Sequence, residues 1–425
     1  MSTTSLLLVA IALCAGVIGL FVLRASPRGT VVIWALSLFF VPVWIGVIAG
    51  PVWAVTTLIT VAAIIASARD VRLTAADGLV AAFALLVVVL FALRMTTLAA
   101  AVIAMLEWVV PYIWGRLVLA RVSALFVTRV IAAVATAAAV LAIVEFATGS
   151  NAFVTLQGPG SLDNWRELQP RGPFLRAEGA FGHSIALGAS LAMSTVFVIA
   201  SRWRTPIVLI ALAVVLGGVV VTLSRIGLIT AAIALGVAVL MMPGTRRRVR
   251  ALVGAGAIGA AVLILPFVQD VFVEAGEGAA DSAAYRGSLL SLLPEVHVLG
   301  AAGDWTGRTV DGVYLGAFAN SVDNAMLVIG LRFGWVPTLL VAAVFALLAL
   351  RVLRGRANPP TIAVVSQLPA LFTVALITQW GMFLWFLVGL AVAWGAIDDD
   401  RASGSASALS LPSPALRPSV GGPSA

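Results

Sequence analysis

The chain alternates between long apolar runs and short turns that are rich in arginine, glycine and proline. Most runs have about 20 residues, the length at which an α-helix crosses a bilayer core of about 30 Å. We expect an all-α fold: a polytopic transmembrane helix bundle of about 12–13 spans, with two long extracytoplasmic loops. The expected spans cover residues 4–23, 30–48, 52–68, 75–93, 96–115, 127–147, 184–201, 206–223, 226–242, 251–270, 324–350, 361–378 and 381–397.

Two apolar runs are too long for one span. Residues 30–67 would measure about 57 Å as a single helix, nearly twice the bilayer core. Gly50-Pro51 supplies a break there, because proline interrupts a helix. By the same argument we divide residues 361–397 near Gln379–Gly381.

The arginines predict the orientation of the spans. Short turns after even-numbered spans carry only Arg94 and Arg225. By the positive-inside rule, the N-terminus lies outside the cytoplasmic membrane and the C-terminus lies in the cytoplasm. The turns after odd-numbered spans carry Arg24, Arg28, Arg69, Arg72, Arg116, Arg121, Arg129, Arg202, Arg204, Arg246, Arg247, Arg248, Arg250, Arg351, Arg354 and Arg356.

This topology divides the chain into six parts. Long structured loops on one side of a membrane usually carry function, so part of the site is expected in the second outer loop. The last part is rich in serine, proline, alanine and glycine and is expected to be a disordered cytoplasmic tail. The parts are N-terminal spans 1–147, first outer loop 148–183, central spans 184–270, second outer loop 271–323, C-terminal spans 324–397 and tail 398–425.

Composition excludes several kinds of chemistry. The sequence is 62% hydrophobic and 10% charged, and all 26 of its basic residues are arginine. Without lysine there is no Walker A lysine and no Schiff base. His183 and His297 are far apart and Cys14 is alone, so we expect no metal site, no disulfide and no cofactor. The net charge of +8 lies mostly beside the spans, so no nucleic-acid partner is indicated.

Several arginines lie at or just inside the predicted outer face, where the positive-inside bias disfavours them. A guanidinium group binds phosphate oxygens through two parallel hydrogen bonds, so such a cluster suits a lipid-linked diphosphate. The arginines are Arg171, Arg176, Arg225, Arg286 and Arg332. Structural alternatives are ion pairs with Glu167 or Glu178 for the first two, lipid headgroups for Arg225, Asp281 or Glu295 for Arg286, and Asp323 for Arg332.

Asp323 is the candidate general base, at the start of an expected helix. Asn324 would orient a substrate, although either residue could instead cap the helix. His183 is a possible supporting residue with a structural alternative. Among other acids, Glu145 is expected to face the first outer loop, and residues 398–400 are interpreted as a solvated helix end and not as a metal site.

Four segments occur in an order that resembles the O-antigen ligase and O-antigen polymerase superfamily of membrane glycosyltransferases. They are RGPFLRAEGAFGHSIALG (171–188), TLSRIGLI (222–229), YRGSLL with VLGAAG (285–303) and DNAMLVIGLRFGWVP (323–337). In the last segment Asp323 stands where the ligases have histidine, which favours the polymerase branch.

The resemblance implies a metal-independent glycosyltransferase that uses a polyprenyl-diphosphate-linked oligosaccharide and a glycan acceptor, in the bilayer and beside other polysaccharide-export proteins. Arg171, Arg176, Arg225 and Arg286 would hold the diphosphate, and Asp323 would accept the proton of the attacking hydroxyl. Ligase-type transfer to a different acceptor, a transporter or flippase of an anionic solute, and a non-catalytic scaffold remain open alternatives.

Overall fold

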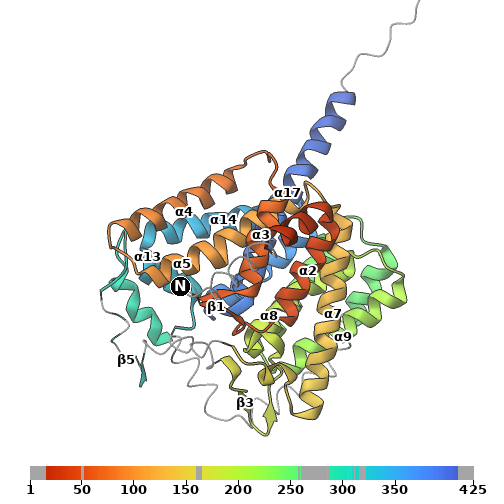
Figure 1. Ribbon diagram of the computed structural model, residues 1–425. Coiled ribbons are helices and arrows are strands. Elements are labelled where there is room, and N and C mark those ends of the chain that lie inside the picture. The colour runs from red at the N-terminus through yellow and green to blue at the C-terminus, as the bar shows by residue number, and fades with distance from the viewer. Residues whose placement is uncertain are drawn as a thin grey trace, which may run out of the picture.

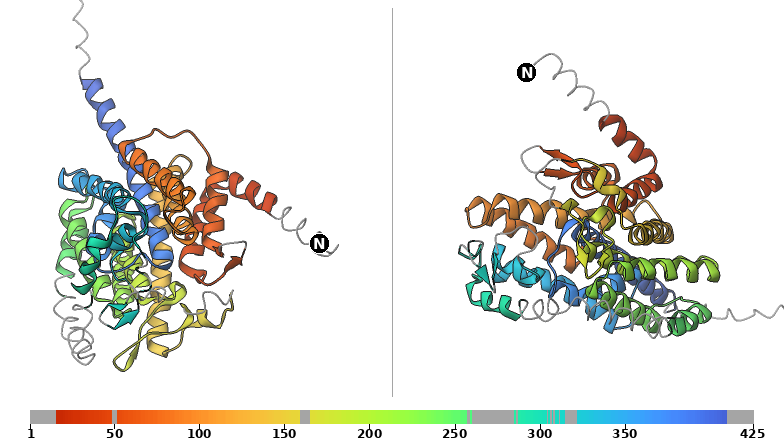
Figure 2. Two further views of the ribbon diagram at one scale, coloured as in Figure 1. Left: turned by 90° about the vertical axis from the view of Figure 1, so that its left-hand side faces the viewer. Right: turned by 90° about the horizontal axis from the view of Figure 1, so that it is seen from below.

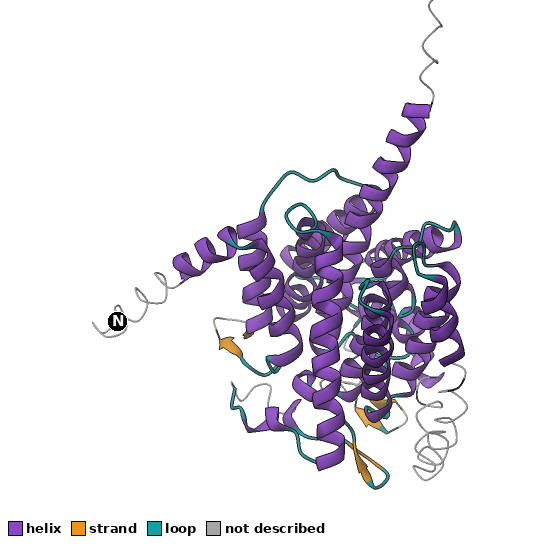
Figure 3. Cartoon of the chain, turned by 90° about the vertical axis from the view of Figure 1, so that its right-hand side faces the viewer, coloured by secondary structure: helices purple, strands orange, loops and turns teal. Residues whose placement is uncertain are grey.

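The computed structural model describes residues 16–48, 52–158, 165–256, 259, 285, 287–303, 305, 307, 309–310, 312–314 and 322–409. Within these residues the fold is all-α, and its strands are confined to three two-stranded hairpins (Figure 1). Figure 3 shows that the hairpins lie toward one end of the bundle. The strands are β1 (Gly46–Ile48), β2 (Val52–Ala54), β3 (Pro170–Arg171), β4 (Phe174–Leu175), β5 (Thr309–Val310) and β6 (Val313–Tyr314).

Most apolar runs form helices close to their expected bounds. In Figure 1, α7, α8 and α9 run side by side, while α4 and α14 cross the bundle as a second pair. The first helices are α2 (Pro27–Phe40), α3 (Val55–Ser67), α4 (Ala75–Ala92), α5 (Leu98–Ile103), the π-helix η1 (Ala104–Val109), α6 (Val110–Val118) and α7 (Ala124–Thr148). Then follow α8 (Ser184–Ala200), α9 (Thr205–Val221), α10 (Arg225–Met241), α13 (Ala325–Phe333), α14 (Trp335–Leu353), α15 (Pro359–Val365), α16 (Leu368–Leu371) and α17 (Thr378–Leu409). Short 3-10 turns are η2 (Ala152–Thr155), η4 (Gly179–Phe181) and η5 (Leu289–Glu295).

The helices are those of a multi-pass membrane protein. Among the described residues, five helices are long and apolar enough to cross a bilayer, and four shorter apolar helices accompany them. A sixth span is possible if Gly16–Ala25 and α2 count together, although they are bent by 118°. In Figure 2 the N-terminal helix projects from the rest of the bundle. The five are Ala75–Ala92, Leu98–Val118, Ala124–Thr148, Trp335–Leu353 and Thr378–Arg401.

The expected span 30–48 is not one helix. α2 ends at Phe40, and Val41 adopts an extended conformation. Pro42 follows directly, and the residue before a proline is disfavoured in the helical region. The chain then forms the β1–β2 hairpin, so the next helix begins only at Val55.

Two further expected spans are broken. Residues 324–350 form α13 and α14, which separate at Gly334, where φ is 93°. Residues 361–378 form the short helices α15 and α16, because Pro369 cannot continue α15. The break before the last span therefore lies before Thr378 and not at Gln379–Gly381.

The last helix is longer than expected. α17 continues to Leu409, so the first part of the expected tail 398–425 is helical. Residues 410–425 lie outside the described part of the chain.

The arginine-bearing turns share one face of the bundle. Arg121 donates hydrogen bonds to Ala66 O (2.6 Å) and to Arg24 O (2.9 Å). Arg129 donates to Ser201 O at 3.0 Å. These contacts join turns far apart in sequence, as the expected alternation requires, while the side of the membrane on which they lie stays a prediction.

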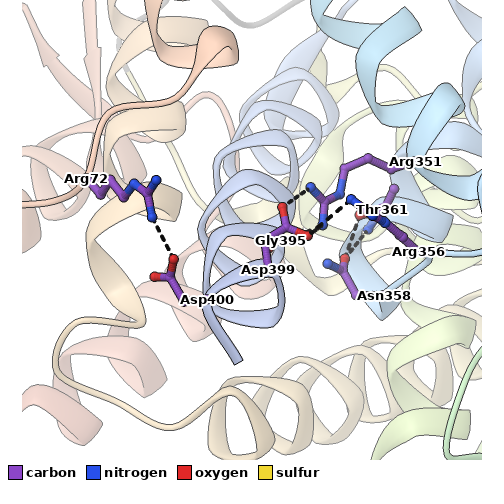
Figure 4. A network of polar contacts seen from close by, with 8 residues as sticks. All are labelled: Arg72, Arg351, Arg356, Asn358, Thr361, Gly395, Asp399 and Asp400. Atoms are coloured by element: carbon purple, nitrogen blue, oxygen red, sulfur yellow. Dashed lines mark hydrogen bonds and ion pairs between the residues drawn. The ribbon is translucent and has the colours of Figure 1, made fainter. Parts of the chain in front are cut away.

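Residues 398–400 belong to the same face and do more than solvate a helix end. Asp399 of α17 pairs with Arg351 of α14 at 2.8 Å, and Asp400 pairs with Arg72 at 2.6 Å (Figure 4). Arg351 also donates to Gly395 O at 3.2 Å. These contacts fix the end of α17 to the turns beside it.

The core lies around α17. Phe39 of α2 contacts Phe383 of α17 and Phe181 of η4, with ring centroids 5.4 and 5.6 Å apart. Gly115 of α6 and Gly389 of α17 bring their backbones into close approach, since a Cβ on either would collide with a backbone carbonyl of the other helix. Small residues allow such crossings between membrane helices.

Candidate functional site

A pocket of about 450 Å³ lies at the end of the bundle away from the arginine-bearing turns. α8 connects the two ends of the bundle. His183, directly before its first turn, lines the pocket, whereas Ser201 at its other end accepts a hydrogen bond from Arg129. The pocket is lined by Gln169, Arg171, Arg176, His183, Ile185, Ser224, Arg225, Ile226, Ile229, Asp323, Thr373, Val374, Ala375 and Ile377. Five of the predicted site residues thus meet in one place: Arg171, Arg176, His183, Arg225 and Asp323.

A small hairpin of the first outer loop presents two of the arginines. Strands β3 and β4 pair, and Gly172 between them has a φ of 55°, which glycine adopts without strain. The N–H of Arg176 donates to Gln169 O at 3.1 Å and closes the base of the hairpin. Arg171 and Arg176 therefore stand at opposite ends of one short, closed turn.

Both arginines donate hydrogen bonds to the turn between α9 and α10. Arg171 Nη1 donates to Leu223 O at 2.8 Å, and Arg176 Nε donates to Thr222 O at 3.1 Å. The same turn leads into Arg225, because Ser224 caps α10 by accepting from the N–H of Gly227 at 3.2 Å. The turn thus brings Arg225 to the same pocket as the two arginines of the distant hairpin.

Close packing of α8 and α10 supports this turn. A Cβ on Gly188 would lie 2.8 Å from Oγ1 of Thr222, and a Cβ on Gly227 would lie 3.3 Å from the backbone of Gly188. The glycines therefore allow the two helices to begin side by side at the pocket.

His183 caps α8 and stays neutral. Its Nδ1 accepts from the N–H of Ile185 at 3.2 Å, so the proton of the neutral ring lies on Nε2. Burial, together with the positive charge of Arg176, lowers the pKa of His183 to about 3. His183 can therefore donate a hydrogen bond in the pocket but is not a proton acceptor at neutral pH.

Burial also shifts the pKa values of the loop charges. Burial and the neighbouring Arg171 lower the pKa of Arg176 to about 10, so it remains a cation. Burial raises the pKa of Glu178 to about 7, against the opposing effects of the Gln169 N–H and of Arg176. The alternative that Arg176 serves only as an ion-pair partner of this acid is not favoured, because its guanidinium donates to Thr222 O and to Gln169 Oε1.

Asp323 and Asn324 have different environments. Asp323 lines the pocket, and the start of α13 is held there by a bond from Ala325 N to Val374 O at 3.0 Å. Oδ1 of Asn324 accepts from the N–H of Leu327 at 2.9 Å, which makes Asn324 the N-cap of α13. The structure thus supports the capping alternative for Asn324, while its role toward a substrate stays a prediction.

Arg332 lies away from the pocket. It is near the end of α13, where its carbonyl oxygen accepts from Oγ1 of Thr96, between α4 and α5, at 2.9 Å. Its electrostatic partner is Glu107 of η1, in place of the expected Asp323. Arg286 lies outside the described residues, so its role toward a diphosphate stays a prediction.

Sequence reasoning located one of the residues that hold the loop, Glu145, and missed another, Gln169. Glu145 accepts from the N–H groups of Glu178 (3.0 Å) and Gly179 (2.9 Å) and from Nδ2 of Asn151 (3.0 Å). The expectation that it faces the first outer loop is confirmed. Gln169 had no signal in the sequence, because its role depends on how the hairpin folds.

The described residues contain no group of three or more histidine, cysteine, aspartate or glutamate side chains that could hold a metal ion. The pocket is lined by three guanidinium groups, one carboxylate, a neutral imidazole, the polar side chains of Gln169, Ser224 and Thr373, and apolar side chains.

Fold and site together define a multi-pass helical membrane protein with an arginine-lined pocket at one face. No family model, no curated protein and no solved structure matches the chain. The resemblance to the O-antigen ligase and polymerase superfamily is carried by the four sequence segments alone and stays a prediction.

Proposed function

We propose that the chain transfers or polymerises polyprenyl-diphosphate-linked oligosaccharide units at the outer face of the cytoplasmic membrane. The observation that carries this proposal is the meeting of Arg171, Arg176, Arg225 and Asp323 in one pocket at the end of apolar helices. The predicted orientation, with the N-terminus outside and the C-terminus in the cytoplasm, belongs to the proposal because it turns this pocket outward.

The pocket is suited to a diphosphate. Guanidinium groups match phosphate oxygens in charge and geometry. The N-terminal ends of α8, α10 and α13 lie at the pocket, and each helix N-terminus adds about half a positive charge. His183 contributes a neutral donor. Together these groups favour an anion without a metal ion or a cofactor.

The pocket also has an apolar border. Ile226 and Ile229 line it from α10, and Ile229 is half exposed on the outer surface of that helix. A polyprenyl tail would leave the pocket over these side chains and continue into the lipid, which solvates it at no cost in exposed apolar surface.

The proposed reaction uses one proton acceptor. The acceptor hydroxyl oxygen attacks the anomeric carbon of the donor sugar, and Asp323 takes the hydroxyl proton as the new glycosidic bond forms. The bond between the anomeric carbon and the diphosphate oxygen breaks with its electron pair. The arginines stabilise the negative charge that develops on the leaving polyprenyl diphosphate.

The test uses Asp323→Asn and Arg225→Ala in the native host, with membrane levels of each protein measured. Matched controls are Asp70→Asn and Arg354→Ala, since both residues are exposed and lie away from the pocket. Loss of extracellular polymer with accumulation of lipid-linked repeat units supports the polymerase. Polymer that forms but is not attached indicates ligase-type transfer, and normal glycan from both variants would refute the site.

An anionic-solute transporter or flippase is the second candidate, and the interaction of Glu107 with Arg332 favours it. Charges within membrane helices often mark a transport path. The chain reconstituted in liposomes would then move a lipid-linked saccharide across the bilayer without changing it. If liposomes with the protein moved the lipid-linked saccharide no faster than empty liposomes, this function would be excluded.

A further inference from the structure

The first outer loop contains a buried acid that the proposed reaction does not use. Glu178 is only 1% exposed, directly before η4. Its Oε1 accepts from the N–H of Gln169 at 3.1 Å. Within the described part of the chain, its other carboxyl oxygen, Oε2, has no hydrogen-bond partner. A buried carboxyl group with one unsatisfied oxygen is costly when it is ionised.

Glu178 is connected to the arginine hairpin through one residue. Gln169, which donates to Glu178, also accepts from Nη1 of Arg176 through its side-chain oxygen at 3.4 Å. The N–H of Glu178 is itself held by Glu145 of α7 at 3.0 Å. The acid therefore lies in a fixed position behind a guanidinium group that lines the pocket.

The charged groups around Glu178 come from three elements. Arg176 attracts its negative charge from the hairpin, and Glu145 repels it from α7. Arg171 adds a second positive charge beside Arg176. At the start of α8, His183 is neutral over the range in which Glu178 titrates, since the pKa of His183 is about 3. Arg225 and Asp323 complete the charges of the pocket.

We propose that Glu178 is a positioning residue that sets the net charge behind the arginine pocket, so that an anionic diphosphate binds more tightly when Glu178 carries a proton. The inference rests on the proposed function, because it names how the same site is regulated. Ionised Glu178 offsets part of the charge of Arg176. Protonated Glu178 leaves that charge available to the ligand.

This arrangement couples binding to proton uptake. A diphosphate next to Arg176 disfavours the ionised form of Glu178, and linkage requires that protonation favours the diphosphate by the same factor. Because burial raises the pKa of Glu178 to about 7, the effect falls between about pH 6 and 8. A coupling of one pKa unit corresponds to about a tenfold change in affinity.

The experiment measures binding to the full-length chain in detergent by calorimetry between pH 5.5 and 8.5. The probe is a short-chain prenyl diphosphate glucose, a diphosphate diester without a titratable proton in this range. The unsubstituted chain is expected to bind several-fold more weakly at pH 8 than at pH 6, and to take up protons from the buffer. Glu178→Gln keeps an oxygen that can accept from Gln169, and its affinity is expected to stay at the acid value throughout.

Glu167→Gln is the matched control, because Glu167 is an exposed acid of the same loop. It should follow the unsubstituted chain. Equal pH slopes in Glu178→Gln and the unsubstituted chain would overturn the inference and leave the proposed function standing. No binding of the probe by the unsubstituted chain at any pH would overturn both.

Discussion

At the scale of single residues, the pocket arginines are held by backbone oxygens of the α9–α10 turn. Leu223 O and Thr222 O accept from Arg171 and Arg176 and are uncharged. These contacts orient the two guanidinium groups, and because the accepting oxygens are uncharged, the contacts themselves do not cancel the positive charge. An anion that enters the pocket meets positive charge in a prepared geometry, which lowers the cost of ordering on binding.

Lysine should not replace Arg176. Lysine keeps the charge but lacks the planar fork that reaches Thr222 O and a ligand oxygen together. We expect Arg176→Lys to bind the prenyl diphosphate glucose about tenfold more weakly, measured by calorimetry at one pH. Arg354→Lys, on the opposite face, should bind as the unsubstituted chain does; equal weakening of both variants would contradict a local role.

His183 should make stability depend on acid. Its pKa in the folded chain is about 3, below its usual value of 6.5, so its contribution is present above pH 6.5 and is lost as the pH falls toward 3. The loss is about 1.4 kcal/mol per pH unit. Thermal unfolding in detergent should therefore show a shallower acid decline for His183→Asn, which retains a capping side chain. Parallel declines in both proteins would disprove the assignment.

At the scale of elements, hydrophobicity alone located several helices with nearly correct bounds. The expected span 75–93 became α4, and 184–201 became α8, with nearly the same bounds. The run 361–378 misled for a physical reason. Residues 359–364 of α15 are all buried inside the bundle, and a buried short helix is as apolar as a span.

The α6–α17 crossing should tolerate no side chain at its closest point. A methyl group on Gly389 would collide with the carbonyl oxygen of Tyr112, so the helices would have to separate. We expect Gly389→Ala to lower the free energy of unfolding by about 1–3 kcal/mol, as in overpacked cores. The loss would be measured as a lower melting temperature in detergent. Gly236→Ala is the control, because nothing lies within 4 Å of a Cβ there; a similar loss in both would mean that the crossing is not special.

The candidate site was predictable only in part. Arg171, Arg176 and Arg225 were found because they defy the charge bias of membrane turns, a property of sequence and topology. Arg332 was misplaced because neither the end of α13 at Gly334 nor the contact of that end with Thr96 was expected from the sequence. Glu178 became informative only once its buried environment was known.

At the scale of the whole molecule, the two faces differ in their charge partners. On one face, arginine and acidic side chains form ion pairs at the ends of α14 and α17, whereas on the other face arginines line a pocket. The proposed orientation, with the pocket facing outward, predicts which residues a membrane-impermeant reagent reaches from outside. In a Cys14→Ala background, Arg225→Cys and Asp323→Cys should be labelled on intact cells, and Arg354→Cys only after lysis. Labelling of 225 and 323 from opposite sides would exclude a shared site.

α17 joins these two faces in one unbroken helix. It begins at Thr378, next to the pocket residue Ile377, and carries Asp399 and Asp400 on the opposite face of the bundle. A continuous helix transmits a displacement better than a flexible loop does, so we expect any shift at the pocket on substrate entry to be felt at the other face. A fluorophore placed beside Arg351 would therefore act as a remote reporter of occupancy, read at the face of the bundle opposite the pocket.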